Sequence, residues 1–475
     1  MGKRPKKIGV GQLVLQIVFP EGTTNDGTGE TEDNGLEAST AAPAVSSQPE
    51  RKRKWYSLID KVYALPNLQQ AWQQVAANGG AGGSDGMTLA TFRENADARL
   101  EQLAADLRAK TYRPQPVRRV FIPKSGGGQR PLGIPSIRDR IVQQALRQIL
   151  EPIFEGKFSK HSHGFRPEKG CATALSVVDQ AIKYGYQWVV DADLQAFFDT
   201  VDHEKLLAAL NEEIADGSVL RLVRQILKAG VVLPETATVE PTELGTPQGG
   251  PLSPLLANVY LHHFDTRMVQ AGYGLVRYAD DFVLFAKSEG EATAALTLAR
   301  QVLEEELGLR LHPEKTRVVS VAHGFEFLGF HYFRDPQTDQ LRKEVRSKSA
   351  RRFRETIRAR TPRLKNQRKP KARRLTVVRL AKNQRLRRMI ADLNRFLRGW
   401  HWYFKAVWSP YRTPFRHFDG FVRQRVRTAI TGRVGAGWWN QRLSNAVLRE
   451  LGLIPLEEWH RQYQRGQLVT PARKG

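Results

Sequence analysis

Three aspartates stand where predicted strands end, and their spacing indicates a site for divalent metal ions. Asp193 lies at the end of the apolar run Trp188–Leu194, while Asp280 and Asp281 form an acidic turn within the apolar segment Leu275–Ala286. Phosphoryl transfer to a 3′-hydroxyl requires two metal ions about 4 Å apart, and carboxylates are ligands that suit Mg²⁺. An Asp pair alone is often an ordinary turn. The additional carboxylate upstream favours the metal site.

Neighbouring polar residues are assigned other roles. Asp191 shares a strand face with Asp193 but lies deeper, so it is the less attractive ligand. Asp199 and Asp202 precede His203 at a predicted helix start, and we expect them to cap that helix.

The elements expected to position these residues alternate between helices and strands. Apolar residues at helical spacing predict helices over residues 55–115, interrupted by a glycine-rich turn at Asn78–Gly86. Two strands about an acidic turn are expected in Leu275–Ala286, and helices fill the basic region beyond Arg342, with interruptions near Pro362, Pro370 and Pro410. The remaining predicted elements are a strand at Val117–Ile122 with a turn at Ser125–Gly128 and a return at Leu132–Ile134, helices at Arg138–Phe154 and Ala172–Tyr184, and strands at Trp188–Leu194 and Phe325–Tyr332.

The charge of the chain is concentrated at one end. The sequence has 475 residues and a net charge of +26, enough length for two or three domains. From Leu341 onward it contains 36 basic and 7 acidic residues, whereas residues 1–340 contain 38 basic and 41 acidic residues. Six of the nine Trp also follow Leu341. A basic segment interleaved with aromatic residues is typical of a nucleic-acid-binding surface, and a solvated helix face is the alternative.

Other features limit the class of protein. The single cysteine, Cys171, excludes a disulfide framework and a Cys-cluster zinc site, and it indicates a reducing compartment. No apolar run approaches 18 residues, and the best candidate, Val10–Phe19, is short, so we expect no membrane partner and a location in the cytoplasm or nucleoid. Residues 20–50 contain seven acidic and no basic residues and are predicted to be a disordered linker.

Five segments, in order along the chain, resemble the boxes of reverse transcriptases, most closely those encoded by bacterial group II introns. A further segment, Leu393–Phe404, is similar to the Gly-Trp-x-x-Tyr-Phe stretch of the thumb, or maturase domain X, of that family. The resemblance runs from about Trp55 to near the C-terminus. The five boxes are His163–Pro167, Asp193–Asp199, Gly245–Pro254, Tyr278–Asp281 (Tyr-Ala-Asp-Asp) and Phe327–Phe330.

This resemblance implies the roles of the acidic residues. Asp193 and Asp280 would bind two Mg²⁺ ions, for which Mn²⁺ can substitute, with Asp281 beside them and the backbone carbonyl of Leu194 as a further ligand. Phe198 would be the steric gate, because its ring would occupy the space that a ribose 2′-hydroxyl needs. The alternative is that Phe198 is a residue of the hydrophobic core.

The resemblance also implies contacts with the nucleotide. Lys124 and Arg130, at either end of a glycine turn, would bind the triphosphate, although a solvated hairpin has the same composition. Gln248 would contact the nucleotide and template backbone, since neighbouring glycines allow a close approach. Lys315 would reach the primer or the nucleotide, or remain a surface residue. For Phe197 we favour a core position.

Four residues are predicted to contact nucleic acid: Arg166, Arg395, Arg398 and Trp400. The aromatic residues around Trp400 are interpreted as mainly core, and the arginines near them as phosphate ligands.

The predicted architecture is an α/β fold, the right-hand polymerase with fingers, palm and a basic helical thumb. Residues 1–50 are an N-terminal extension, 51–187 the fingers with the first palm strands, 188–335 the palm and 336–475 the thumb or maturase X domain. We expect no C-terminal endonuclease module of the Cys/His type. The chain would be a monomer or a homodimer.

The predicted function is RNA-templated DNA synthesis from a primer and deoxynucleoside triphosphates. A second expected role is that of a maturase, which binds structured group II intron RNA and supports splicing and mobility. The alternatives are an RNA-binding splicing factor with little polymerase activity, a related enzyme adopted for DNA repair or defence, and an RNA-templated RNA polymerase.

Overall fold

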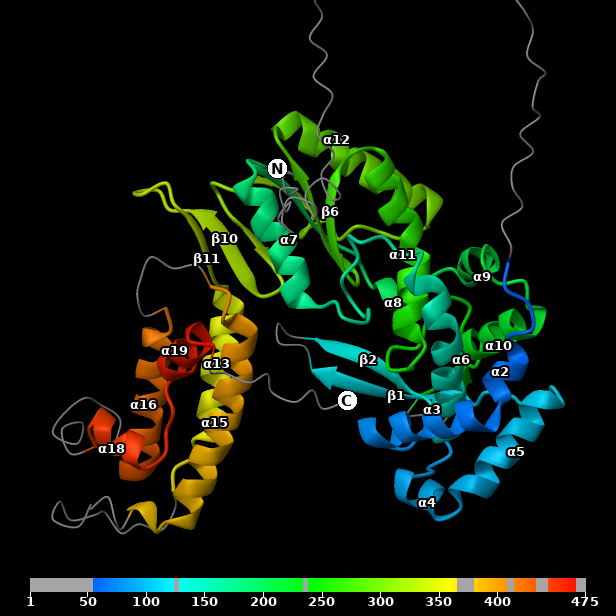
Figure 1. Cartoon of the computed structure of the whole chain (residues 1–475), viewed down its shortest axis with the longest axis horizontal. Helices are drawn as coiled ribbons and strands as arrows, with labels where there is room; N and C mark the ends of the chain where they lie inside the picture. Colours follow the sequence, from blue (N-terminus) through cyan, green and yellow to red (C-terminus); the bar gives the residue numbers. More distant parts are fainter. Residues whose placement is uncertain are drawn as a thin grey trace, which may run out of the picture. The chain divides into compact units, whose positions relative to one another are not determined.

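The computed structural model describes residues 54–123, 128–233, 238–364, 380–407, 414–432 and 443–466. They divide into two compact units (Figure 1). The first unit contains the residues up to Tyr186 together with Ala192–Arg317, and the second contains Gln187–Asp191 and the residues from Val318 onward. In the described part of the chain, no helix combines the length and the apolar character needed to cross a bilayer.

The first unit begins with four helices, of which α2 and α3 pack against one long helix, α6 (Ile137–Glu155), and α5 packs on α2 and α3. Their buried residues recur every three to four positions, as predicted: Leu68, Ala71 and Val75 in one helix and Leu100, Leu103 and Leu107 in another. This packing buries the apolar face that each short helix could not bury alone. The surrounding helices are α2 (Ile59–Tyr63), α3 (Leu65–Asn78), α4 (Leu89–Glu94) and α5 (Ala96–Arg108).

An antiparallel hairpin of β1 (Val117–Pro123) and β2 (Gln129–Ile134) confirms the predicted strand and its return. Its register places Ile122 opposite Arg130. The sheet continues as β2-β1-β4-β5, where β4 is Val231–Val232 and β5 is Val239–Glu240. Most of the predicted turn at Ser125–Gly128 lies outside the described residues.

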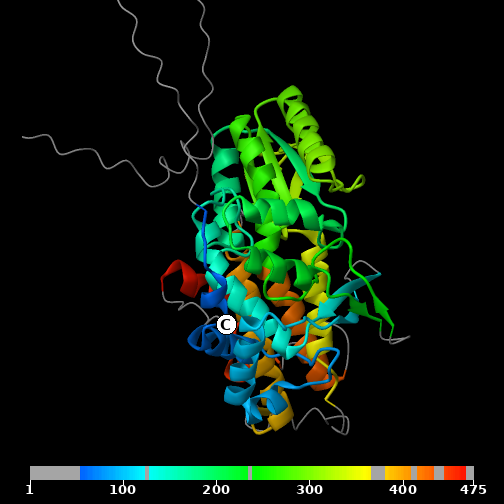
Figure 2. The same cartoon turned by 90° about the vertical axis from the view of Figure 1, so that its right-hand side faces the viewer.

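A second hairpin carries the acidic turn. Strands β6 (Gly274–Tyr278) and β7 (Asp281–Ala286) pair antiparallel, which confirms two strands about that turn. They belong to a sheet of order β6-β7-β3-β8, in which β3 is Trp188–Asp193 and β8 is Arg317–Ser320. Helices pack against the hairpin (Figure 1, Figure 2), namely α7 (Cys171–Lys183), α11 (Ser253–Gln270) and α12 (Glu289–Arg300), the last followed by the π-helical turn η1 (Gln301–Glu306).

Three short helices follow β3 along the chain: α8 (Phe197–Thr200), α9 (His203–Asn211) and α10 (Gly217–Leu227). The predicted capping role is confirmed for Asp202, whose Oδ1 accepts from the backbone amides of Glu204 at 2.8 Å and Lys205 at 3.0 Å. Asp199 instead lies inside α8, whose N-cap position is occupied by Ala196.

The second unit pairs a small sheet, of order β11-β10-β9, with basic helices. Its strands are β9 (Phe325–Phe327), β10 (Phe330–Arg334) and β11 (Leu341–Val345). The described helices are α13 (Ser347–Arg360), α15 (Gln384–Phe404), α16 (Arg416–Thr431), α18 (Asn445–Glu450) and α19 (Leu456–Gln464).

Two predictions about this region are wrong. Phe325–Tyr332 is not one strand, because Leu328 (φ 44°) and Gly329 (φ 84°) form a tight left-handed turn that reverses the chain between Phe327 and Phe330. The residues beyond Arg342 do not begin as helix. They complete β11, where Lys343 is fully buried with its ammonium over the ring of Phe330 at 5.0 Å.

One carboxylate links distant parts of the first unit. Asp216 caps α10 through Oδ1, which accepts from Ser218 at 2.9 Å and Val219 at 3.3 Å. Its Oδ2 accepts from the amides of Leu58 at 2.7 Å and Ile59 at 2.9 Å. Burial acts to raise the pKa of Asp216, but the four amides outweigh it and hold the pKa below its usual value. The ionised form is therefore stabilised by folding.

We predict that Asp216→Ala lowers the free energy of unfolding at pH 7 by about 2 kcal/mol, more than the roughly 1 kcal/mol expected for Asp202→Ala, which removes a cap alone. Because the folded pKa of Asp216 is depressed, its contribution is complete above the unfolded pKa and is lost as the pH falls below about 4. Urea denaturation at pH 7 and pH 3.5 measures both effects. Equal losses for the two variants at pH 7 would contradict the link to residues 58 and 59.

Candidate active site

The acidic turn is a two-residue hairpin loop under backbone strain. Tyr278 pairs with Asp281, which leaves Ala279 and Asp280 as the loop. Ala279 has φ of +60°, a conformation that costs a residue with a Cβ about 1–3 kcal/mol and persists where the surroundings enforce it. The loop therefore holds Asp280 in an orientation that an unconstrained turn would not maintain.

Asp193 is positioned by pairing with a distant segment. Its backbone carbonyl accepts from the amide of His312 at 2.8 Å, and the amide of Gln195 donates to the carbonyl of Arg310 at 2.8 Å. Because backbone groups alternate in direction along a strand, the carbonyl of Leu194 points away from residues 310–312. This orientation is compatible with the predicted role of the Leu194 carbonyl as a metal ligand.

The same pairing brings a cation to Asp193. The Nζ of Lys315 lies 2.5 Å from Oδ2 of Asp193, and both side chains are partly exposed, at 57% and 29%. Lys315 follows a turn in which its amide donates to the carbonyl of His312 at 3.2 Å. Lys315 thus reaches the acidic site itself, which sequence reasoning left open.

Electrostatics link the two carboxylates. Burial raises the pKa of Asp280; its own backbone amide lowers it, the negative charge of Asp193 raises it, and Arg130 and Lys315 lower it, with a net increase. The negative charge of Asp193 therefore acts on the carboxyl group of Asp280. Arg130, exposed on β2, acts on the same carboxylate.

The donor set fits a hard divalent cation. It consists of two carboxylates that repel each other, a neighbouring third in Asp281 and the carbonyl of Leu194, and a cation of this kind completes its shell with substrate phosphates and water. Across the described residues, no group of three or more His, Cys, Asp or Glu is gathered closely enough to hold a metal alone.

A pocket of about 140 Å³ joins three predicted motifs of the first unit. Phe198 is half-buried and lines it, and its carbonyl accepts from the amide of Thr246 at 2.7 Å. The amide of Gly133 in turn donates to the carbonyl of Gln248 at 2.9 Å. Phe197 is only 2% exposed, which confirms its core position. Phe198, Gln248, Arg119, Gly133, Thr246 and Pro247 are among the lining residues.

Two residues that sequence reasoning did not single out hold the acidic turn. Arg277 is 1% exposed and donates to the carbonyl of Ala279 at 2.9 Å. Gly164 lies so close to the turn that a Cβ there would sit 2.4 Å from the amide nitrogen of Ala279. The signal for Arg277 was available, since a charged residue in the apolar run Leu275–Tyr278 needs a buried partner.

The geometry does not support nucleic-acid binding by Arg166. Its side chain is 6% exposed, and its guanidinium donates to both carboxylate oxygens of Glu155 at 3.0 Å and to the carbonyls of Ser159 at 2.6 Å and Ser162 at 3.2 Å. Arg166 instead stabilises the loop that contains it. Lys124 lies outside the described residues.

The remaining predicted contacts belong to the second unit. Trp400 packs among aromatic rings, with ring centroids 4.5 Å from Phe353 and 4.8 Å from Phe418, which favours the interpretation as core. The guanidinium of Arg398 lies over Trp459 at 5.8 Å, and Arg395 is exposed.

Two known families match parts of the chain. The family described as reverse transcriptase (RNA-dependent DNA polymerase) matches residues 122–332, and the maturase-specific domain of group II introns matches residues 373–445. These matches identify an RNA-directed DNA polymerase. More narrowly, the chain belongs to the bacterial group II intron type of reverse transcriptase and maturase.

Two relatives and one solved structure are similar to parts of this chain. Protein YkfC of Escherichia coli (strain K12) is 36% identical over 290 residues, covering 53% of this chain and 76% of that protein. The group II intron-encoded protein LtrA of Lactococcus lactis subsp. cremoris is 40% identical over 201 residues, covering 42% of this chain and 33% of LtrA. Among solved structures, a chain of a partial Cas6-RT-Cas1--Cas2 complex is 26% identical with a TM-score of 0.34, covering 53% of this chain and 42% of that chain.

We predict that Gly164→Ala reduces the rate of primer extension by about 10²-fold, because the new methyl group must displace the backbone that carries Asp280. Gly170→Ala, in the same loop, is the matched control, since a Cβ there meets nothing within 4 Å. Single-turnover extension measures both variants. Equal rates for Gly164→Ala and the control would contradict the claim that a methyl group at residue 164 displaces the turn at Ala279.

Proposed function

We propose that this protein copies an RNA template into DNA by phosphoryl transfer assisted by two Mg²⁺ ions, held by Asp193, Asp280 and the carbonyl of Leu194 with Asp281 beside them. The observation that carries this proposal is that β3, which ends at Asp193, is the sheet neighbour of β7, which follows the turn with Asp280, and that the charge of Asp193 acts on the Asp280 carboxyl. Bound metal would activate the 3′-hydroxyl and neutralise the leaving pyrophosphate.

In this proposal, the positively charged side chains of the site change partners when the nucleotide binds. Lys315 pairs with Asp193 when no substrate is bound, so that one carboxylate of a repelling pair is neutralised. When the nucleotide enters, its phosphates offer Lys315 an alternative partner and leave Asp193 available to metal. Arg130, whose charge already acts on Asp280, would bind the triphosphate together with Lys124.

The pocket of Phe198 and Gln248 would receive the sugar and base of the incoming nucleotide. The half-buried ring of Phe198 is supported from one side by Phe197, with ring centroids 5.1 Å apart and the planes at 72°. A supported ring keeps a fixed position, which a steric gate against a 2′-hydroxyl needs.

The basic second unit would bind nucleic acid, including structured group II intron RNA. Arg395 and Arg398 on α15 are the proposed phosphate contacts. We assign residues 51–187 to the fingers, 188–335 to the palm and 336–475 to the thumb or maturase X domain, and we propose activity in the bacterial cytoplasm or nucleoid. The chain spans about a third of LtrA, so the role in splicing is inferred from the matched maturase-specific segment.

We predict that Asp280→Ala abolishes primer extension on an RNA template, a loss of at least about 10³-fold, and leaves the affinity for RNA unchanged. Asp97→Ala, which removes an exposed carboxylate in the first turn of α5, is the control and should retain activity. Extension with Mg²⁺ and each nucleotide set, combined with filter binding of RNA, separates the two functions. Synthesis by Asp280→Ala at the control rate would refute the assignment of the site.

Phe198→Ala is expected to admit ribonucleotides, because truncation of the ring opens the space that a 2′-hydroxyl needs. Its discrimination between dCTP and CTP, taken as the ratio of kcat/KM values, should fall by about 10²-fold or more, mostly through faster use of CTP. If sugar selectivity did not change, Phe198 would be a packing residue only.

A further inference from the structure

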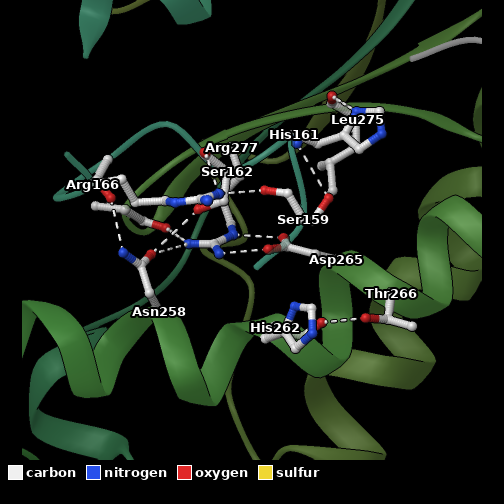
Figure 3. A network of polar contacts seen from close by, with 12 residues as sticks. Ser159, His161, Ser162, Arg166, Asn258, His262, Asp265, Thr266, Leu275 and Arg277 are labelled. Atoms are coloured by element: carbon white, nitrogen blue, oxygen red, sulfur yellow. Dashed lines mark hydrogen bonds and ion pairs between the residues drawn. The ribbon is translucent and has the colours of Figure 1, made fainter. Parts of the chain in front are cut away.

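A charged residue is completely buried directly before the acidic turn. Arg277 is 1% exposed, although it lies in β6 among apolar neighbours. Its partner Asp265, on α11, is 0% exposed. Figure 3 shows the guanidinium of Arg277 between the carboxylate of Asp265 and the amide of Asn258.

The contacts of this guanidinium point in two directions. Nε and Nη2 of Arg277 donate to the two carboxylate oxygens of Asp265, both at 2.6 Å, in a bidentate pair. Nη1 donates to Oδ1 of Asn258 at 3.1 Å and to the carbonyl of Ala279 at 2.9 Å. The last contact connects a rigid ion pair on α11 to the strained residue of the turn.

The backbone of Arg277 is held as firmly as its side chain. Its amide donates to the carbonyl of His161 at 2.9 Å, and its carbonyl accepts from the amide of His163 at 2.8 Å. Asn258 closes the arrangement, because its Nδ2 donates to the carbonyl of Gly164 at 2.9 Å. The loop of residues 161–164, the turn and α11 are therefore joined through Arg277 and Asn258.

Stability alone gives a weak reason for this arrangement. Replacing a buried ion pair by apolar residues of similar volume is often neutral or stabilising, since both charges must lose their hydration. A planar guanidinium, however, provides five donors in a fixed geometry, so it can fix a carbonyl relative to a carboxylate. Leu or Met at the same positions would fill the space without orienting the turn.

We propose that Arg277, oriented by Asp265, is a positioning residue that fixes the Ala279 carbonyl and thereby the orientation of the Asp280 carboxylate. The inference rests on the proposed function of Asp280 as a metal ligand. Asp265 and Arg277 touch neither substrate nor metal in this scheme. They fix the position of the Asp280 carboxylate before any substrate binds.

The test is the double variant Arg277→Met/Asp265→Leu, which removes both charges and keeps the volume. Without metal or substrate, the amides of residues 278–282 should exchange hydrogen about tenfold faster, as expected for the loss of a charge-assisted hydrogen bond. The kcat of primer extension should fall by about 10²-fold, while KM for the nucleotide and the Kd for primer–template stay unchanged. Tyr112→Phe is the control, because it removes another buried hydrogen bond, to Asp139 at 2.5 Å, in the same unit.

The outcomes separate the inference from the function on which it rests. A folded double variant with the exchange and kcat of the wild type would overturn the positioning role. If the double variant does not fold, Arg277→Lys decides by the same readouts, because an ammonium can pair with Asp265 but cannot also span the distance to Ala279. Absence of DNA synthesis by the wild-type protein would refute the proposed function, whereas the exchange experiment would still test the role of Arg277.

Discussion

The structure depends on holding close together two carboxylates that repel each other. Asp193 and Asp280 come from the end of β3 and the β6–β7 turn, and the charge of Asp193 makes Asp280 harder to ionise. The compensating positive charge comes from Lys315, which pairs with Asp193, and from Arg130, whose charge acts on Asp280. In the proposed function, the same cations bind the phosphates of the incoming nucleotide, so the interaction that stabilises the free site would also prepare it for substrate.

Holding this arrangement requires rigidity around the turn. The positive φ of Ala279 is unfavourable for a residue with a Cβ, and it is enforced from three sides. The register of the β6–β7 hairpin leaves only two residues in the loop, Gly164 allows a neighbouring loop to pack directly on the turn, and Arg277 holds the Ala279 carbonyl. Strain at the acidic turn is thus balanced by contacts with residues far from it in sequence.

Sequence reasoning succeeded where local pattern and function coincide. The apolar hairpin about Asp280, the cap at Asp202 and the buried Phe197 follow from alternation, from spacing and from the preference of Asp for helix starts. It failed where tertiary partners override the local pattern. Leu328 adopts a turn conformation that its side chain does not favour, and Lys343 is buried under aromatic rings in a strand expected to be helix.

The arginines show the same limit. Arg166 and Arg277 have the charge of nucleic-acid ligands, but Glu155 and Asp265 bind them inside the first unit, and neither carboxylate is adjacent in sequence. Only the packing of α6 and α11 reveals these partners. Among basic residues, the sequence alone therefore does not distinguish those that face a substrate from those that hold the site together.

The most direct test of the account is a double-mutant cycle of Mn²⁺ affinity, measured by electron paramagnetic resonance on the protein with bound nucleotide and primer–template lacking a 3′-hydroxyl. If Asp193 and Asp280 hold the same ion, Asp193→Asn and Asp280→Asn each weaken binding strongly, and the double variant loses little more than either single variant. If the two losses simply add, the carboxylates do not share a metal, and the central claim is wrong.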